Sequence, residues 1–106
     1  MPWSIYIAHF FGAAFVANAL PHLTAGIAGK PLQSPFATPP FRGLSSPAVN
    51  VAWALANLAL AYLLLIRIGP LDLHRWHDAA VAFAGFGSMT FLCSRSFARL
   101  RRTGLG

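Results

Sequence analysis

Charged residues are scarce in this sequence of 106 residues, and acidic ones are the scarcest. Only 9% of the residues are charged while 57% are hydrophobic, and Asp72 and Asp78 are the two acids, with no glutamate. A di-iron carboxylate centre, which is built largely from glutamates, is therefore excluded. The single cysteine, Cys93, excludes an internal disulfide and a cysteine-based zinc site. So few charges beside so many apolar residues are rare in a water-soluble domain, and the composition predicts insertion into a membrane.

The central hydrophobic run, residues 47–66, contains no charged residue and no histidine. As a helix rising ~1.5 Å per residue it would span the roughly 30 Å hydrocarbon core of a bilayer. Hydrophobic segments also precede and follow it. We therefore expect an all-α membrane protein in which three transmembrane helices form one domain, with a long proline-rich loop between helices 1 and 2. The expected ranges within 1–106 are helix 1 at about 3–27, the loop at 28–46, helix 2 at about 47–67, helix 3 at about 73–97 and a basic tail at 98–106.

The segments around this central run give further signals. No lysine or arginine precedes the first segment and His9 interrupts it, so we expect a retained helix and not a signal peptide. The prolines of the loop exclude a regular helix or a central strand, while its leucines and phenylalanines favour an ordered strap, in the interface or over the end of the bundle. Ala80, Ala84 and Ser88 recur at every fourth residue, which is the spacing of a tightly packed helix face.

The basic residues divide unevenly between the two expected sides of the membrane. Six lie on one side, and Arg67 and Arg75 lie on the other together with both acids. The positive-inside rule then places the N-terminus outside and the C-terminus in the cytoplasm, in a bacterial inner membrane. Because the charges flank apolar spans, we expect contacts with membrane lipid head groups and no nucleic acid partner. The six residues are Lys30, Arg42, Arg95, Arg99, Arg101 and Arg102.

Polar side chains near the expected cytoplasmic end form a first candidate site. Asn18 and His22 are four residues apart on one helix face, and Asn50 enters at comparable depth from the start of helix 2. These three residues are candidates for binding a lipid head group, a quinone head or a metal. The alternative is that Asn50 bonds to the loop backbone while His22 points to water. Asn50 and Asn57, seven residues apart, are expected to join helices through hydrogen bonds.

Histidines at the opposite end form a second candidate site. His74 and His77 lie on neighbouring turns, and Asp78 is placed to orient one of them. His9 descends from the same side and would supply a third ligand or an axial ligand for haem, although its greater depth opposes a matched axial pair. The alternative is that His74 and His77 are interfacial anchors beside Trp76.

The sequence shows no pattern that indicates catalysis. It lacks a phosphate-binding loop and an assignable Ser/His/Asp set, so we expect no enzymatic activity of its own. The first functional hypothesis is a small structural or accessory subunit that packs within a larger membrane complex or with itself. The second is a redox subunit that binds haem, a quinone or a lipid through either candidate site. The third is an oligomeric carrier of small solutes with Asn57 at mid-membrane.

Overall fold

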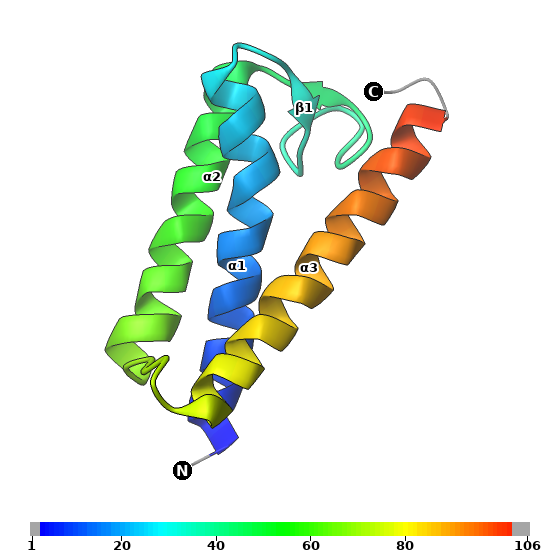
Figure 1. Ribbon diagram of the computed structural model, residues 1–106. Helices are drawn as coiled ribbons and strands as arrows, with labels where there is room; N and C mark the ends of the chain where they lie inside the picture. The colour runs from blue at the N-terminus through cyan, green and yellow to red at the C-terminus, as the bar shows by residue number, and fades with distance from the viewer. Residues whose placement is uncertain (1–2, 103–106) are drawn as a thin grey trace.

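The computed structural model describes residues 3–102, which form three helices (Figure 1). Helix α1 covers Trp3–Ile27. Helix α2 covers Pro47–Tyr62 and continues directly into the π-helical segment η1, Leu63–Ile68. Helix α3 covers Trp76–Arg102.

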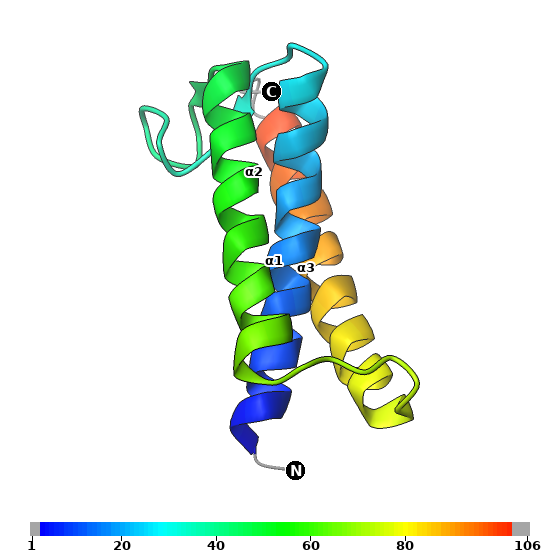
Figure 2. The same ribbon diagram turned by 90° about the vertical axis from the view of Figure 1, so that its left-hand side faces the viewer.

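The helices form an elongated bundle that is open at one end. Helices α1 and α2 lie side by side and antiparallel, whereas α3 packs on α1 in its first half and then diverges from the pair (Figure 1 and Figure 2). The connection between α1 and α2 lies at the same end as the C-terminal end of α3, and the N-terminus lies at the other end. The bundle is 45 Å long, which exceeds the roughly 30 Å hydrocarbon core of a bilayer.

Local signals explain where α1 ends and where α2 begins. Gly29 has a φ of 73°, and the Lys30 N–H bonds back to the last turn of α1 at 2.8 Å, which closes that helix. Ser46 caps α2, because its Oγ accepts a hydrogen bond from the Val49 N–H at 3.2 Å. Pro47 occupies the first turn of α2, where no backbone N–H is needed. Short-range bonds therefore fix both ends of the proline-rich connection.

Helix α3 begins later than its expected range of 73–97. The carboxylate of Asp72 accepts a hydrogen bond from the His74 N–H at 3.0 Å, and the Arg75 N–H donates to the Asp72 carbonyl at 3.0 Å. An aspartate that bonds to the backbone two residues onward makes a turn and not a helix. The first residue of α3 is therefore Trp76.

The residues expected to form a basic tail, 98–106, continue α3 as far as Arg102. Arginine has a high helix propensity, and a positive charge in the last turn interacts favourably with the helix dipole. Arg99, Arg101 and Arg102 occupy that turn. Residues 103–106 lie outside the range that the structure describes.

The proline-rich connection folds against the end of the bundle. It contains two short antiparallel strands, β1 (Leu32–Gln33) and β2 (Leu44–Ser45), with Leu32 opposite Ser45. The prolines exclude a regular helix and a central strand, but this short pair was not expected, and no proline occupies a position in either strand. The hydroxyls of Ser34 and Ser45 are buried and lie 2.5 Å apart.

Helices α1 and α3 meet in close backbone contact at Gly85. A Cβ atom at this buried position would overlap the backbone of Phe10, whose carbonyl oxygen is its nearest neighbour. Ala80, Ala84 and Ser88 are exposed. The prediction that these three residues form a tightly packed face is therefore wrong for contacts within this chain, because α3 presents Gly85 to α1 instead.

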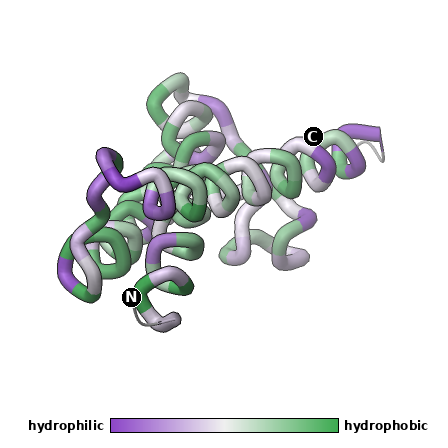
Figure 3. Tube along the Cα trace, turned by 60° about the horizontal axis from the view of Figure 1, so that its bottom comes forward, coloured by the Kyte–Doolittle hydropathy of each residue, from purple (hydrophilic) through white to green (hydrophobic). Residues whose placement is uncertain are grey.

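The interior of the bundle holds alanines and polar side chains, whereas large hydrophobic side chains face outward. Phe83 and Phe91 are each 80% exposed, and many other large hydrophobic side chains face outward. Hydrophobic residues run along the helices in Figure 3, while the C-terminal end of α3 is hydrophilic. Soluble proteins show the reverse distribution in their cores. The largest fully buried side chains are all polar: His9, Asn50, Asn57, Asp78 and Ser34.

Two helices are long and apolar enough to cross a membrane. These are α1 and the continuous helix Pro47–Ile68, which joins α2 and η1. Helix α3 is not one of them, and it carries Asp78 in its first turn and arginines in its last. The expected helical fold is confirmed, with two of its three helices suited by length and composition to span a membrane.

Candidate functional site

A ladder of polar side chains links the three helices. Asn18 Nδ2 donates to Asn57 Oδ1 at 2.9 Å, and Asn57 Nδ2 donates to the Trp53 carbonyl at 2.8 Å. From α3, the Cys93 thiol donates to Asn18 Oδ1, with the sulfur 3.6 Å from the oxygen. Asn57 thus joins α2 to α1 by a hydrogen bond, as expected for this face of α2. Interhelical bonds of this kind contribute ~0.6–2 kcal/mol each, which is enough to fix the register of the helices.

Asn50 holds His22 in one orientation. The Asn50 Nδ2 donates to the backbone carbonyls of Leu32, Ser45 and Ser46, at 3.1, 3.2 and 3.1 Å. Because carbonyl oxygens only accept, these bonds assign the amide nitrogen and leave the amide oxygen on the opposite side. That oxygen lies 2.6 Å from His22 Nδ1. The proton on Nδ1 of His22 is therefore donated to Asn50.

The second ring nitrogen of His22, Nε2, remains as an acceptor. A neutral imidazole carries one N–H, which here is on Nδ1. The His22 side chain is 4% exposed, and within residues 3–102 its one hydrogen bond is to Asn50. Its ring stands edge-on to the rings of Trp53 and Phe97. His22 therefore does not point to water, whereas Asn50 does bond to the loop backbone.

A cavity of about 420 Å³ lies between α1, α3 and the proline-rich connection. Asn18 and His22 line it from α1, and the aromatic side chains of Phe41, Trp53 and Phe97 form much of its wall. Among the residues that the structure describes, none of those lining the cavity is lysine, arginine, aspartate or glutamate. A volume of this size is typical of a small-molecule site.

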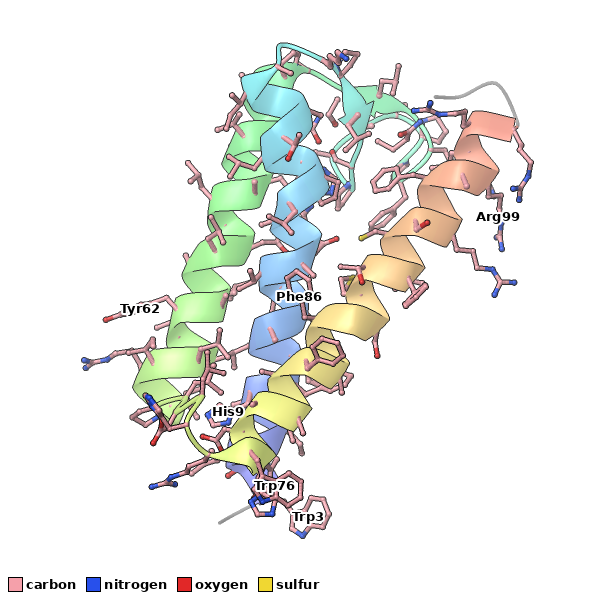
Figure 4. All side chains as sticks on the ribbon, viewed as in Figure 1. Trp3, His9, Tyr62, Trp76, Phe86 and Arg99 are labelled. Carbon is pink, nitrogen blue, oxygen red and sulfur yellow. The ribbon has the colours of Figure 1, made fainter. Side chains whose placement is uncertain are left out.

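His9 lies at the opposite end of the bundle (Figure 4), where it faces Asp78, and both side chains are fully buried. His9 Nε2 donates to the Gly69 carbonyl at 2.6 Å, which leaves Nδ1 4.0 Å from Asp78 Oδ2. The same Oδ2 accepts from the Asp72 N–H at 3.1 Å. His9 Nδ1 and Asp78 Oδ1 have no hydrogen-bond partner within residues 3–102.

His74 and His77 have other surroundings than His9. His74 Nδ1 lies 3.2 Å from Asp72 Oδ1 at the surface, and the ring of His77 stacks on the neighbouring tryptophan with centroids 3.8 Å apart. Asp78 faces His9, and the expectation that it orients one of the other two histidines is corrected. In the part of the chain that the structure describes, no group of three or more His, Cys, Asp or Glu is arranged to hold a metal.

The turn before α3 keeps Asp72 ionised at the surface. The backbone N–H of His74 lowers the pKa of Asp72 below its ordinary value, and the His74 side chain and the Arg75 charge act in the same direction. Arg75 Nε lies 3.7 Å from Asp72 Oδ2. Water screens such exposed charges, so the Asp72 pairs contribute little to stability. The Asp72 pairs are exposed to water, whereas the His9–Asp78 pair is buried.

Sequence analysis found part of the cavity and missed the rest. The structure connects His22 to Asn50 and places Asn18 and His22 in the cavity wall, while Asn50 acts behind His22. The contribution of α3, which includes Cys93 and Ser96, was not foreseen. One available signal was the amphipathic pattern of this half of α3, where arginines alternate with small and apolar residues.

No family model, curated protein or solved structure that was compared matches the chain. The functional argument therefore depends on the residues and their geometry.

Proposed function

We propose that the protein is a small integral membrane subunit whose three helices all cross the bilayer. The observation that carries this proposal is the inverted polarity of the bundle, in which the largest fully buried side chains are polar and large hydrophobic side chains face outward. In lipid the apolar surface is solvated by acyl chains, and the polar groups avoid a cost of several kcal/mol by bonding to one another inside. Helices α1 and Pro47–Ile68 have the length and hydropathy for this.

Helix α3 can cross as well, because its charges lie near its ends. Asp78, in its first turn, is turned inward to His9. Arg99, in its last turn, points away from the bundle (Figure 4), and the long arginine side chain can extend to the lipid head groups. Trp3 and Trp76 both lie at the opposite end of the bundle and are 82% and 72% exposed. Tryptophan is enriched at this level of a membrane.

The fold supports one orientation in the membrane. The connection that contains Lys30 and Arg42 lies at the same end of the bundle as the arginine-rich end of α3, and η1 with Arg67 ends at the other. By the positive-inside rule we propose that the arginine-rich end faces the cytoplasm of a bacterium, with the N-terminus outside its inner membrane.

Within the membrane we assign the chain an accessory role. Helix α3 exposes the small residues Ala80, Ala84 and Ser88, with the exposed rings of Phe83 and Phe91 on the same helix. Small residues allow a second helix to approach closely and gain van der Waals contact. Because this face has no partner within the described chain, we propose that it packs against a further membrane subunit or a second copy.

The variant Ala84→Phe tests this role. A phenyl ring on the small face should obstruct the approach of another helix and weaken association about five- to 150-fold, since overpacking costs ~1–3 kcal/mol. The measurement is size-exclusion chromatography with light scattering, after purification from native membranes in a mild detergent. Ala59→Phe adds the same ring to an exposed alanine of α2 and should leave assembly unchanged. A wild-type protein that purifies as a lone monomer, without another subunit, would contradict the accessory role.

A further inference from the structure

We propose that the cavity beneath the proline-rich connection binds a neutral ring that bears a hydroxyl group, which is the chemistry of a membrane quinol. Three observations support it: the acceptor nitrogen of His22, the uncharged lining and the aromatic walls. The inference uses the proposed membrane location but not the accessory role. Ligand binding and subunit association are therefore measured separately, and either can fail without the other.

His22 determines which polar group the ligand must carry. His22 lines the cavity, and Nε2 is the ring nitrogen that the bond to Asn50 leaves as an acceptor, so a ligand hydroxyl can donate to it. The proton cannot move from Nδ1 to Nε2 without loss of the hydrogen bond to Asn50, because the Asn50 oxygen would then face the lone pair of Nδ1. Asn50 cannot rotate its amide without losing its three bonds to backbone carbonyls. The site is therefore built to accept a hydrogen bond.

The rest of the lining favours a neutral and flat ligand. A phosphate or carboxylate would be buried without a counter-charge, since none of the described residues along the wall is charged. The rings of Phe41, Trp53 and Phe97 provide surfaces on which another ring packs. Ser96 adds one more hydroxyl to the wall. Anionic lipid head groups fit this lining poorly, whereas a hydroxylated ring fits it well.

The position of the cavity suits a ligand that is dissolved in the membrane. The cavity lies at the end of the bundle where α3 has diverged from α1 and α2, and all three helices contribute to its wall. In the proposed membrane arrangement this end lies near the head groups. A polar ring can occupy the cavity there while a hydrophobic tail extends into the bilayer.

The acceptor on His22 predicts that the reduced form of the ligand binds better than the oxidised form. A quinol hydroxyl donates to Nε2, whereas a quinone carbonyl only accepts and would face the Nε2 lone pair. We expect the quinol to bind about three- to tenfold more tightly than the quinone, which is the factor that one neutral hydrogen bond provides.

The test measures binding through the fluorescence of Trp53, which lines the cavity. In the full chain with Trp3→Phe and Trp76→Phe, Trp53 is the remaining tryptophan. Decylubiquinol, held reduced without oxygen, and decylubiquinone are titrated separately into the protein in detergent. We expect saturable quenching by both, with the quinol dissociation constant lower by the factor given above. No saturable quenching by the quinol, or equal affinity for the two forms, would overturn the proposal.

Variants locate the binding in the cavity. Ser96→Phe fills the cavity and should abolish saturable quenching. If Ser96→Phe fails to fold, Leu92→Trp replaces it, because Leu92 also lies in the wall; ligand binding to this variant is measured by isothermal titration calorimetry. Ser94→Phe is the matched control, because Ser94 is exposed and outside the lining. His22→Gln should reduce the preference for quinol below about twofold. Saturable quenching that persists when the cavity is filled would refute the assignment. Quenching by decylubiquinone that an anionic phospholipid reverses, but that decylubiquinol does not reverse, would refute it as well.

Discussion

Replacement of His9 by leucine is expected to lower the free energy of unfolding by about 2–5 kcal/mol, because the buried Gly69 carbonyl loses its hydrogen bond and the buried Asp78 carboxyl group loses its polar neighbour. His9 and Asp78 are both fully buried, and 4.0 Å separates Nδ1 from Oδ2. Leucine fills much of the space of the imidazole but leaves the Asp78 carboxylate with the Asp72 N–H as its one remaining hydrogen-bond partner within residues 3–102. Titration with sodium dodecyl sulfate, followed by circular dichroism, measures the change.

Two controls separate the pairing of these groups from the packing around them. The double variant His9→Leu/Asp78→Leu should be destabilised by less than the sum of the two single variants, because the two buried side chains are in contact and the carboxyl group is no longer left without its polar neighbour. His74 and Asp72 form a closer pair, at 3.2 Å, but the His74 side chain is fully exposed, so His74→Leu should cause no resolvable change. If His9→Leu were as stable as His74→Leu, the buried pair would have no structural role.

Gly85→Ala is expected to destabilise the protein by about 1–3 kcal/mol, although alanine is the better helix former. The new methyl group would overlap the backbone of Phe10, which cannot move aside as a flexible side chain can. Helices α1 and α3 would have to separate at their closest point, with loss of packing along both. The same detergent titration measures the loss of stability.

Gly87→Ala is the matched control for this prediction. It lies two residues further along α3, and a Cβ atom there would meet nothing within 4 Å. We expect a gain of up to about 1 kcal/mol, since alanine restricts the unfolded chain and favours the helix. The two substitutions therefore differ in sign. Equal effects would show that the α1–α3 crossing is not a close backbone contact.

The positions of the helices could be predicted because local signals determine them. An apolar run without charges, such as residues 47–66, has few alternatives to a helix, and Gly29 and Pro47 end and begin helices through their own backbone preferences. The start of α3 was less certain, because an aspartate favours turns and helix caps equally. Asp72 stabilises a turn, and the helix begins later.

The contacts of α3 with α1 could not be predicted, because they depend on how these two helices cross. The spacing of Ala80 and Ala84 identified a face with small residues but not the residue that meets α1, which is Gly85. Asp78 was expected to orient His74 or His77, which are near it in sequence, whereas the crossing of α3 over α1 brings it to His9. Sequence distance did not indicate this partner.

The candidate site was predictable to the extent that one helix presents it. Asn18 and His22 share a face through their four-residue spacing, and Asn50 enters at a similar depth, so hydrogen bonds among them were foreseeable. The cavity also needs Phe41 from the folded connection and Phe97 from the diverging half of α3. No local pattern determines these positions.

Labelling of single cysteines in bacterial cells tests most directly whether the helix Pro47–Ile68 and α3 both cross the membrane. In a Cys93→Ser background, cysteines replace the exposed residues Thr38, His74 and Arg101 one at a time. We predict that a maleimide that cannot cross membranes labels position 74 in intact spheroplasts, and labels positions 38 and 101 only after the membrane is opened. Labelling of positions 38 and 101 from opposite sides, or recovery of the chain in the soluble fraction, would contradict the account.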